Sequence, residues 1–129
     1  MDFSSRRIRV LVADDSPTAL RSICRYLEYA GEFEVVGTAR DGEHVLQQAE
    51  RFRPDLVLAD LSMPQKNGFE ASSELRRVFP KLRILIFSEL SGLSLCEECM
   101  RSGADGFVEK SQMPEKLMQE VRRLFPQNS

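Results

Sequence analysis

The sequence predicts an α/β fold: a doubly wound, five-stranded parallel sheet with helices on both faces. Two observations lead to this prediction. Five short apolar or β-branched segments alternate with helix-forming segments along the 129 residues, and the connections between them are short. Residues 56–59 (Leu-Val-Leu-Ala) are apolar throughout, which is typical of a strand buried on both faces of a parallel sheet. We expect the flavodoxin-like strand order 2-1-3-4-5.

The first strand and helix have clear boundary signals. Residues 8–13 are mostly apolar and β-branched, and two aspartates follow them. Ser16 is a favoured N-cap residue, and Pro17 suits the first helical position. The predicted helix runs to about Tyr29, and Gly31 provides its stop.

The same alternation continues to the end of the chain, with Gly or Pro near most boundaries. The remaining predicted elements are a strand at 33–39, a helix at 42–52, a strand at 56–59, a helix at 69–79, a strand at 83–88, a weak helix at 93–101, a strand at 107–109 and a last helix beginning at Pro114. We therefore expect a single domain over residues 1–129, with its core at about 7–124 and no output domain.

Four of the five predicted strands end in a chemically capable side chain. Asp14 and Asp15 follow the first strand, Asp60 the third, Ser88 the fourth and Lys110 the fifth. In the expected strand order, the first and third strands flank the topological switch point, where ligands bind in open α/β sheets. The three aspartates should meet there, with Ser88 and Lys110 beside them.

This group of residues predicts a phosphoryl acceptor. Three clustered carboxylates repel one another, and a hard divalent cation such as Mg²⁺ relieves that repulsion. Asp60 could then act as the nucleophile, because carboxylates form acyl phosphates. Mg²⁺ and Lys110 would neutralise charge on the phosphoryl oxygens, while Ser88 would donate a hydrogen bond to the product.

Over about residues 7 to 124 the chain resembles the receiver domain of two-component response regulators. The motifs that carry the resemblance are Asp14-Asp15, Asp60 with Met63-Pro64 and Gly68 downstream, Ser88, and Gly103-Ala-Asp-Gly-Phe-Val-Glu-Lys110. The segment Lys110-Ser-Gln-Met-Pro114-Glu is similar to the branch of receivers usually attached to helix-turn-helix output domains.

The resemblance implies a role for each matched residue. Asp60 would be the phosphorylation site, Asp14 and Asp15 the acid pocket for Mg²⁺, and Lys110 the phosphate-contacting lysine. The other roles implied are metal ligation by the backbone carbonyl of Ser62, and switching by Ser88 together with the aromatic residue Phe107.

The implied partners are proteins. A sensor histidine kinase or histidine phosphotransfer protein would supply the phosphoryl group, and an unknown downstream protein would read the result. Phosphorylation would remodel the face made by the fourth helix, fifth strand and fifth helix, through which a homodimer could also form. The chain would be a signalling receiver, with no enzymatic activity beyond its own phosphorylation and dephosphorylation.

Composition excludes several other classes of function. The net charge is −2 and the sequence pI is about 5.5, so no basic surface for nucleic acid or anionic membrane is indicated. No apolar stretch approaches the ~20 residues that span a bilayer, and the N-terminus lacks a signal-peptide core. We expect a cytoplasmic protein. Its three cysteines do not make a disulfide framework.

Three features of the sequence depart from the receiver pattern. Ser111 follows Lys110 where the family usually has proline after a cis bond, Glu89 follows Ser88 where a small residue is usual, and no output domain is expected within these 129 residues. They leave a second hypothesis open, in which the chain is a receiver-like interaction module that signals without phosphorylation.

Other signals in the chain are weaker. Cys96 and Cys99 form a C-x-x-C pair, but Cys24 and His44 lie far away in sequence, so a four-ligand zinc site is not favoured. His44 is expected to be exposed. A flavin site would need phosphate-cradling residues after the first strand, and the acidic Asp14-Asp15 would repel phosphate there.

Overall fold

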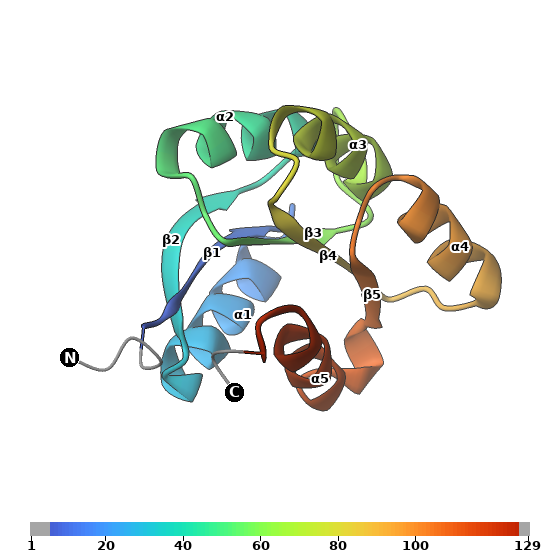
Figure 1. Cartoon of the computed structure of the whole chain (residues 1–129). Coiled ribbons are helices and arrows are strands. Elements are labelled where there is room, and N and C mark those ends of the chain that lie inside the picture. The colour runs from blue at the N-terminus through green and yellow to red at the C-terminus, as the bar shows by residue number, and fades with distance from the viewer. Residues whose placement is uncertain (1–5, 127–129) are drawn as a thin grey trace.

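The computed structural model describes residues 6–126, and these form a parallel sheet between two layers of helices (Figure 1). The strands are β1 (Ile8–Ala13), β2 (Phe33–Ala39), β3 (Leu56–Asp60), β4 (Arg83–Ser88) and β5 (Gly106–Glu109). They lie in the order β2-β1-β3-β4-β5, and all pair in parallel. The predicted fold class and strand order are confirmed.

The helices lie close to their predicted positions. They are α1 (Pro17–Ala30), α2 (Gly42–Phe52), α3 (Gly68–Val78), α4 (Leu93–Arg101) and α5 (Glu115–Leu124), and a short 3₁₀ helix, η2 (Lys110–Gln112), was not predicted. Helix α3 begins one residue earlier than expected, because Asn67 and Glu70 form a reciprocal capping box. Helix α5 begins after Pro114 rather than at it.

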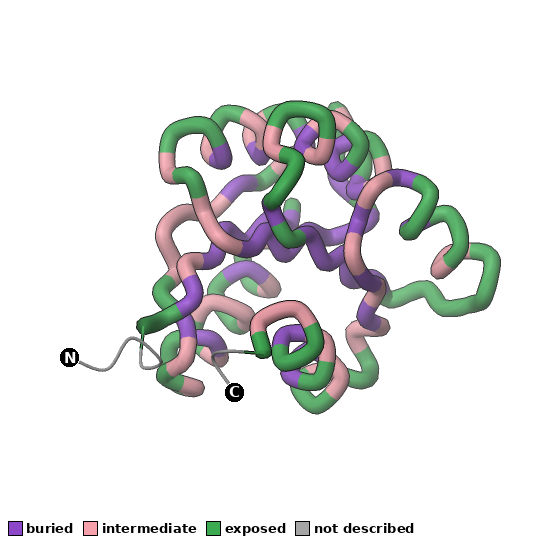
Figure 2. The backbone as a smooth tube through the Cα atoms, viewed as in Figure 1, coloured by how far each residue is buried: buried purple, intermediate pink, exposed green. Residues whose placement is uncertain are grey.

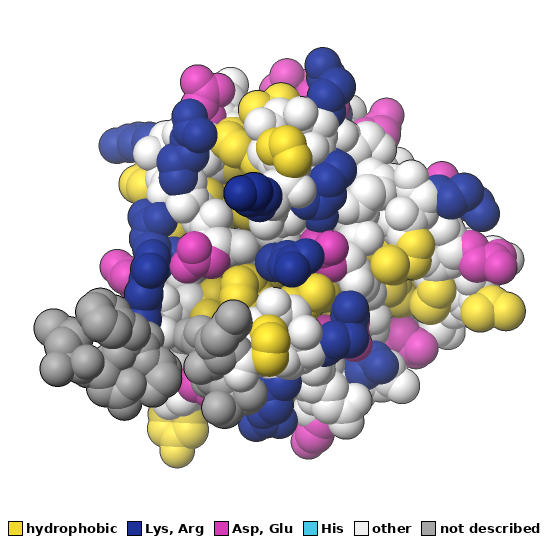
Figure 3. Space-filling view, viewed as in Figure 1, with side chains coloured by type: hydrophobic (Ala, Val, Ile, Leu, Met, Phe, Trp, Pro, Cys, Tyr) yellow, Lys and Arg dark blue, Asp and Glu magenta, His cyan; other side chains and the backbone are white. Residues whose placement is uncertain are grey.

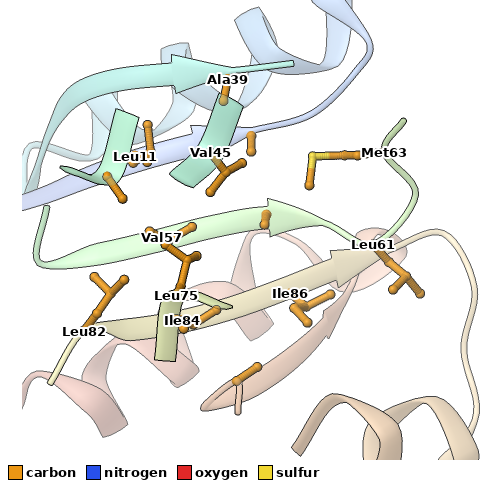
Figure 4. Packing of buried hydrophobic residues seen from close by; sticks show 14 of the residues in the cluster. Leu11, Ala39, Val45, Val57, Leu61, Met63, Leu75, Leu82, Ile84 and Ile86 are labelled. Atoms are coloured by element: carbon orange, nitrogen blue, oxygen red, sulfur yellow. The ribbon is translucent and has the colours of Figure 1, made fainter. Parts of the chain in front are cut away.

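Two hydrophobic layers sandwich the sheet. Helices α2, α3 and α4 lie on one side, and α1 and α5 lie on the other (Figure 1). Figure 2 shows the central strands as the most buried part of the chain, and every residue of β3 is buried. Figure 4 shows the layer beneath α2 and α3, where Leu11, Val57 and Ile84 of three neighbouring strands meet Val45 and Leu75 of the helices.

The register of the sheet decides which side chains meet at its carboxyl edge. Ala13 pairs with Ala59, so the aspartates that follow them emerge side by side. Ser88 pairs with Glu109, which brings the start of η2 next to the end of β4. The aspartates, Ser88 and Lys110 are therefore delivered to one edge by strand pairing alone.

A glycine lets the chain turn back tightly after β3. The Gly68 N–H donates to the carbonyl of Leu61 at 2.8 Å. A Cβ atom at Gly68 would lie 2.9 Å from the carbonyl oxygen of Asp60, closer than real Cβ contacts. The absence of a side chain at Gly68 thus lets α3 start directly beside the end of β3.

Arg76 of α3 ties together the segments that lead into β4 and β5. Its guanidinium donates to the carbonyls of Pro80 and Gly103, both at 2.9 Å, and pairs with Asp105 Oδ2 at 2.7 Å. The same Asp105 oxygen accepts from the Ile84 N–H at 2.8 Å. Because β5 leads straight to Lys110, this clamp also fixes the position of that lysine.

No helix within residues 6–126 is long and apolar enough to cross a bilayer.

His44 is half-buried in α2, so the expectation that it is exposed was wrong. Its backbone N–H donates to Asp41 Oδ1, which caps the start of the helix.

Replacing Arg76 with Met should lower the free energy of unfolding by about 1 to 3 kcal/mol, because it leaves carbonyl oxygens and the partly buried Asp105 carboxylate without their donor. Urea denaturation would measure the loss. Arg77→Met is the matched control, since Arg77 is exposed in the same helical turn, and it should change stability by less than about 0.5 kcal/mol. Equal losses in the two variants would contradict the clamp.

Candidate functional site

The predicted site residues line one pocket at the carboxyl edge of the sheet, with a volume of about 380 Å³. Its lining residues are Asp14, Asp15, Ser16, Asp60, Ser62, Ser88, Glu89, Leu90 and Lys110. Six of the seven residues singled out from the sequence are therefore brought together. Phe107 is the exception, because it is not part of this lining.

The three aspartates form a compact acidic cluster. One carboxylate oxygen from each of Asp14, Asp15 and Asp60 lies within 4.8 Å of the others. Asp14 is 0% exposed and Asp60 is 6% exposed, whereas Asp15 is open to solvent. Among the described residues, this is the one group of three or more His, Cys, Asp or Glu side chains arranged closely enough to hold a metal ion.

Lys110 supplies the positive charge in the pocket. Its Nζ lies 3.3 Å from Asp14 Oδ2 and 3.5 Å from Asp60 Oδ2. It also lies 5.2 Å from the centroid of the Phe87 ring, which is buried in β4 below it. The lysine thus bridges the ends of β1 and β3 from the far side of β4.

Backbone groups hold the other oxygen of each buried aspartate. The Ser16 N–H donates to Asp14 Oδ1 at 2.9 Å, and the Ser62 N–H donates to Asp60 Oδ1 at 3.3 Å. Each bond reaches back two residues, in the manner of an Asx turn. Both carboxylates are therefore fixed on one side by the loop that follows their strand, and they present Oδ2 to Lys110.

The surroundings of Asp60 disfavour its ionised form. Burial and, next in size, the charge of Asp14 raise the pKa of Asp60, Lys110 and the Ser62 N–H lower it, and the net pKa is about 6. For Lys110, burial lowers the pKa, but the charges of Asp60 and Asp14 outweigh that effect and the net shift is upward. The ionised carboxylate of Asp60 is therefore destabilised in this pocket, and a cation that entered would relieve its repulsion with Asp14.

Ser88 and Phe107 occupy different environments. Ser88 is 2% exposed, and its Oγ accepts a hydrogen bond from the Leu90 N–H at 2.9 Å, which leaves the hydroxyl hydrogen free to donate into the pocket. Phe107 is half-buried and packs against the core layer beneath α2, α3 and α4. It pairs with Ile86, two residues before Ser88 on the neighbouring strand.

The cysteine pair lies outside this chemistry. Cys99 is buried, its Sγ donates to the Gly106 carbonyl, and burial raises the pKa of its thiol to about 12. Such a thiol is a poor nucleophile and metal ligand.

In the described chain the cis peptide bond is Met113–Pro114, so the bond between Lys110 and Ser111 is trans.

A larger hollow of about 640 Å³ lies at the opposite, amino edge of the strands. Figure 3 shows hydrophobic side chains gathered at the centre of one face, with Lys and Arg side chains around them. The lining of the hollow includes the cations Arg53, Lys81 and Arg83 and one acid, Asp55, whose Oδ2 accepts from the Arg9 N–H. It lacks the clustered carboxylates of the acidic pocket.

Comparison with known proteins identifies the family of this chain. The family model described as "Response regulator receiver domain" matches residues 10–122. The chain belongs to this family. The match covers β1 from residue 10 onward, the other four strands in full and every residue that lines the acidic pocket, so the pocket is part of the receiver itself.

Individual relatives of the receiver lead to the same family. The transcriptional regulatory protein DegU of Brevibacillus brevis is 29% identical over 119 residues, which cover 92% of this chain and 50% of DegU. A protein-glutamate methylesterase/protein-glutamine glutaminase of Clostridium acetobutylicum is 33% identical over 132 residues, covering 95% and 38%. The solved signal receiver domain of NarL from Mycobacterium tuberculosis has a TM-score of 0.85 at 28% identity, covering 92% of this chain and 95% of that domain.

The receiver spans half or less of the length of those two relatives, and their names denote different activities. The receiver match therefore defines the signalling module and not an output. Two pocket contacts were not foreseen from the sequence: the ring of Phe87 under Lys110, and the N–H of Ser16 on Asp14. The register of the sheet could have indicated the contact between Phe87 and Lys110, because Phe87 pairs with Asp60.

Asp60→Asn should stabilise the receiver in the absence of divalent cations. The pKa of Asp60 is raised from 3.8 to about 6 in the folded state, so the charged form costs stability, and that cost grows as pH rises from about 4 to 6. At pH 7.5 in EDTA the variant should gain up to about 3 kcal/mol, and near pH 3.5 the gain should vanish.

Thermal denaturation across this pH range would measure the difference. Glu97→Gln, which neutralises an exposed acid on α4, is the control and should change stability little at any pH. A wild type that is as stable as Asp60→Asn at pH 7.5 would show that burying this charge costs nothing.

Proposed function

We propose that this receiver is a phosphoacceptor of a two-component phosphorelay, in which Asp60 takes a phosphoryl group from a phosphohistidine of a partner protein. The observation that carries the proposal is the placement of Asp60. It is a nearly buried carboxylate at the end of a central strand, with Lys110 Nζ 3.5 Å away and two further carboxylates within 4.8 Å.

Each residue of the pocket would have its own role in the transfer of the phosphoryl group. Asp60 Oδ2 attacks phosphorus, the bond from phosphorus to the imidazole nitrogen breaks, and a neutral imidazole leaves, because its other ring nitrogen already carries a proton. Lys110 faces the same oxygen and would neutralise charge on the phosphoryl group as it arrives. The Ser62 N–H holds Asp60 Oδ1, so the attacking oxygen keeps its direction.

The donor set of the pocket fits Mg²⁺. It offers carboxylate oxygens from Asp14, Asp15 and Asp60, and Mg²⁺ prefers hard oxygen ligands with few carboxylates and retained waters. The backbone carbonyl of Ser62, which also lines the pocket, would be a further ligand. When bound, Mg²⁺ supplies charge neutralisation for the carboxylates and for the phosphoryl oxygens.

Phosphorylation would act through Ser88 and Phe107. The Ser88 hydroxyl would donate to a phosphoryl oxygen, and because its Oγ is bonded to the Leu90 N–H, the loop after β4 would move with it. Phe107 lies on the next strand and would shift inward with that loop. This is a population shift between two packings, driven by new charge-assisted contacts.

The readout would be a protein contact on the α4-β5-α5 face. Leu93 and Met100 of α4 are 77% and 55% exposed, so α4 offers apolar side chains that a partner protein could bury. The donor would be a sensor histidine kinase or a histidine phosphotransfer protein, in the cytoplasm. The chain would catalyse only its own phosphorylation and dephosphorylation.

Incubation with acetyl phosphate and Mg²⁺ should add one phosphoryl group, a gain of roughly 80 Da in intact mass. The gain should depend on Mg²⁺ and should be absent from Asp60→Asn, because the variant lacks the attacking oxygen. Asp15→Asn keeps the acceptor and loses only an exposed ligand, so it should form the adduct at a higher Mg²⁺ concentration.

If rapid quenching shows no adduct and Mg²⁺ does not bind, the phosphorylation-independent interaction module becomes the better description. An adduct that persists in Asp60→Asn would move the acceptor to another residue.

Self-association through α4 should follow activation. With beryllofluoride as phosphate mimic, the mass from light scattering should rise toward that of a dimer, and Leu93→Glu should prevent the rise by placing a charge in the interface. Tyr29→Glu is the matched control, since Tyr29 is 91% exposed on α1 and away from this face. A monomeric mass with the mimic would rule out the homodimer.

A further inference from the structure

Glu89 is a fourth acid at the mouth of the acidic pocket. It follows Ser88 directly, is exposed, and lines the same pocket as Asp14, Asp60 and Lys110. Its charge reaches the interior, because it contributes to the raised pKa of Lys110. Glu89 is therefore electrostatically part of the site while its side chain stays in solvent.

The carboxylate of Glu89 is not neutralised by a neighbour. Within residues 6–126 it makes no hydrogen bond and no ion pair, whereas other exposed acids such as Glu98 and Glu43 have Arg or Lys partners. All four residues of the loop 89–92 are exposed, and Gly92 gives α4 no side-chain cap. An unpaired charge on a loosely held loop can follow whatever enters the pocket.

The formal charges in the pocket show how Glu89 would act on an incoming anion. Four carboxylates and one ammonium line the pocket, a formal charge of −3. With a divalent cation bound, the formal charge of the pocket would be −1 when Glu89 is counted and zero when it is left out. A dianionic phosphoryl donor would therefore be repelled at the mouth, and the repulsion would be relieved in a donor that carries its own positive charge.

We propose that Glu89 is a specificity-determining residue that disfavours acyl phosphates and favours donors whose phosphoryl group is attached to a positively charged nitrogen group, such as an ammonium or an imidazolium. The inference rests on the proposed function, because it concerns the donor for Asp60. Its consequence is that small acyl phosphates would load the receiver poorly, so that loading would depend on a phosphohistidine partner.

The two reactions differ in how much negative charge they bring into the pocket. With acetyl phosphate, a carboxylate and a dianion react, the oxygen–phosphorus bond to the acyl group breaks, and an acetate anion leaves. With phosphoramidate, the donor is a zwitterion, the nitrogen–phosphorus bond breaks, and neutral ammonia leaves. Both form the same bond from Asp60 to phosphorus, so the extra charge belongs to the acyl donor alone.

The test is the ratio of phosphorylation rates with acetyl phosphate and with phosphoramidate, measured by intact mass at saturating Mg²⁺. Glu89→Gln should raise this ratio by a factor of about three to ten at low ionic strength, since it removes one unit of repulsion at short range. The increase should shrink in about 0.5 M salt, where the Debye length is only a few ångströms. Glu89→Asp should keep the low ratio of the wild type.

Glu97→Gln is the matched control, because it removes the same charge from an exposed position that does not line the pocket, and it should leave the ratio unchanged. The dissociation constant for Mg²⁺, followed by thermal shift, checks that both variants are saturated.

A ratio that is equal in wild type and Glu89→Gln, with adducts formed by both donors, overturns the role of Glu89 and leaves the acceptor proposal standing. An increase that is equally large in Glu97→Gln also overturns it, because net charge alone would then explain the change. Absence of any adduct from either donor overturns the acceptor proposal and the role of Glu89 with it.

Discussion

The contact that organises this receiver is the pair of ionic interactions from one lysine to two buried aspartates. Lys110 Nζ lies 3.3 Å from Asp14 and 3.5 Å from Asp60. Two carboxylates that are 0% and 6% exposed repel each other and are poorly solvated, so they need a compensating charge. Lys110 supplies it from a position 96 residues after Asp14 in the chain, and the site can form only when the sheet has brought β1, β3 and β5 into register.

The sheet tolerates the repulsion between these two carboxylates because its centre is apolar and fully packed. Every residue of β3 is buried, and β4 is buried from Ile84 to Ser88. Helices on both faces fill the space around these strands, and Arg76 fixes the loops that lead into β4 and β5. The apolar core thus offsets the cost of crowding like charges at one edge, which is a common arrangement in functional sites.

Much of the site could be predicted because its residues follow strands. Asp14, Asp60 and Lys110 each stand directly after a recognisable apolar segment, and parallel pairing brings such positions together without further information. The Arg76–Asp105 clamp could not be predicted in the same way. Its partners lie 29 residues apart on a helix and a loop, and their meeting depends on the packing of α3 against the sheet.

The difference in burial between Asp14 and Asp15 could also not be predicted from the sequence. Asp14 and Asp15 are adjacent and identical in type, yet one is fully buried and the other exposed, because successive residues at a strand end point in opposite directions. The 3₁₀ turn at Lys110 was missed for a related reason. Its three residues carry no capping signal, and the turn arises where the chain leaves β5 and bends toward α5.

The element beside the site with the weakest local support is the segment from Glu89 to the start of α4. Helix α4 has no side-chain cap, the four loop residues are exposed, and the Leu90 N–H ties the loop to the pocket by its hydrogen bond to Ser88 Oγ. Any ligand that competes for the Ser88 hydroxyl also competes for the order of this loop. A rigid acidic centre beside a loosely held rim lets a small change in charge favour one arrangement of the loop over another without disturbing the core.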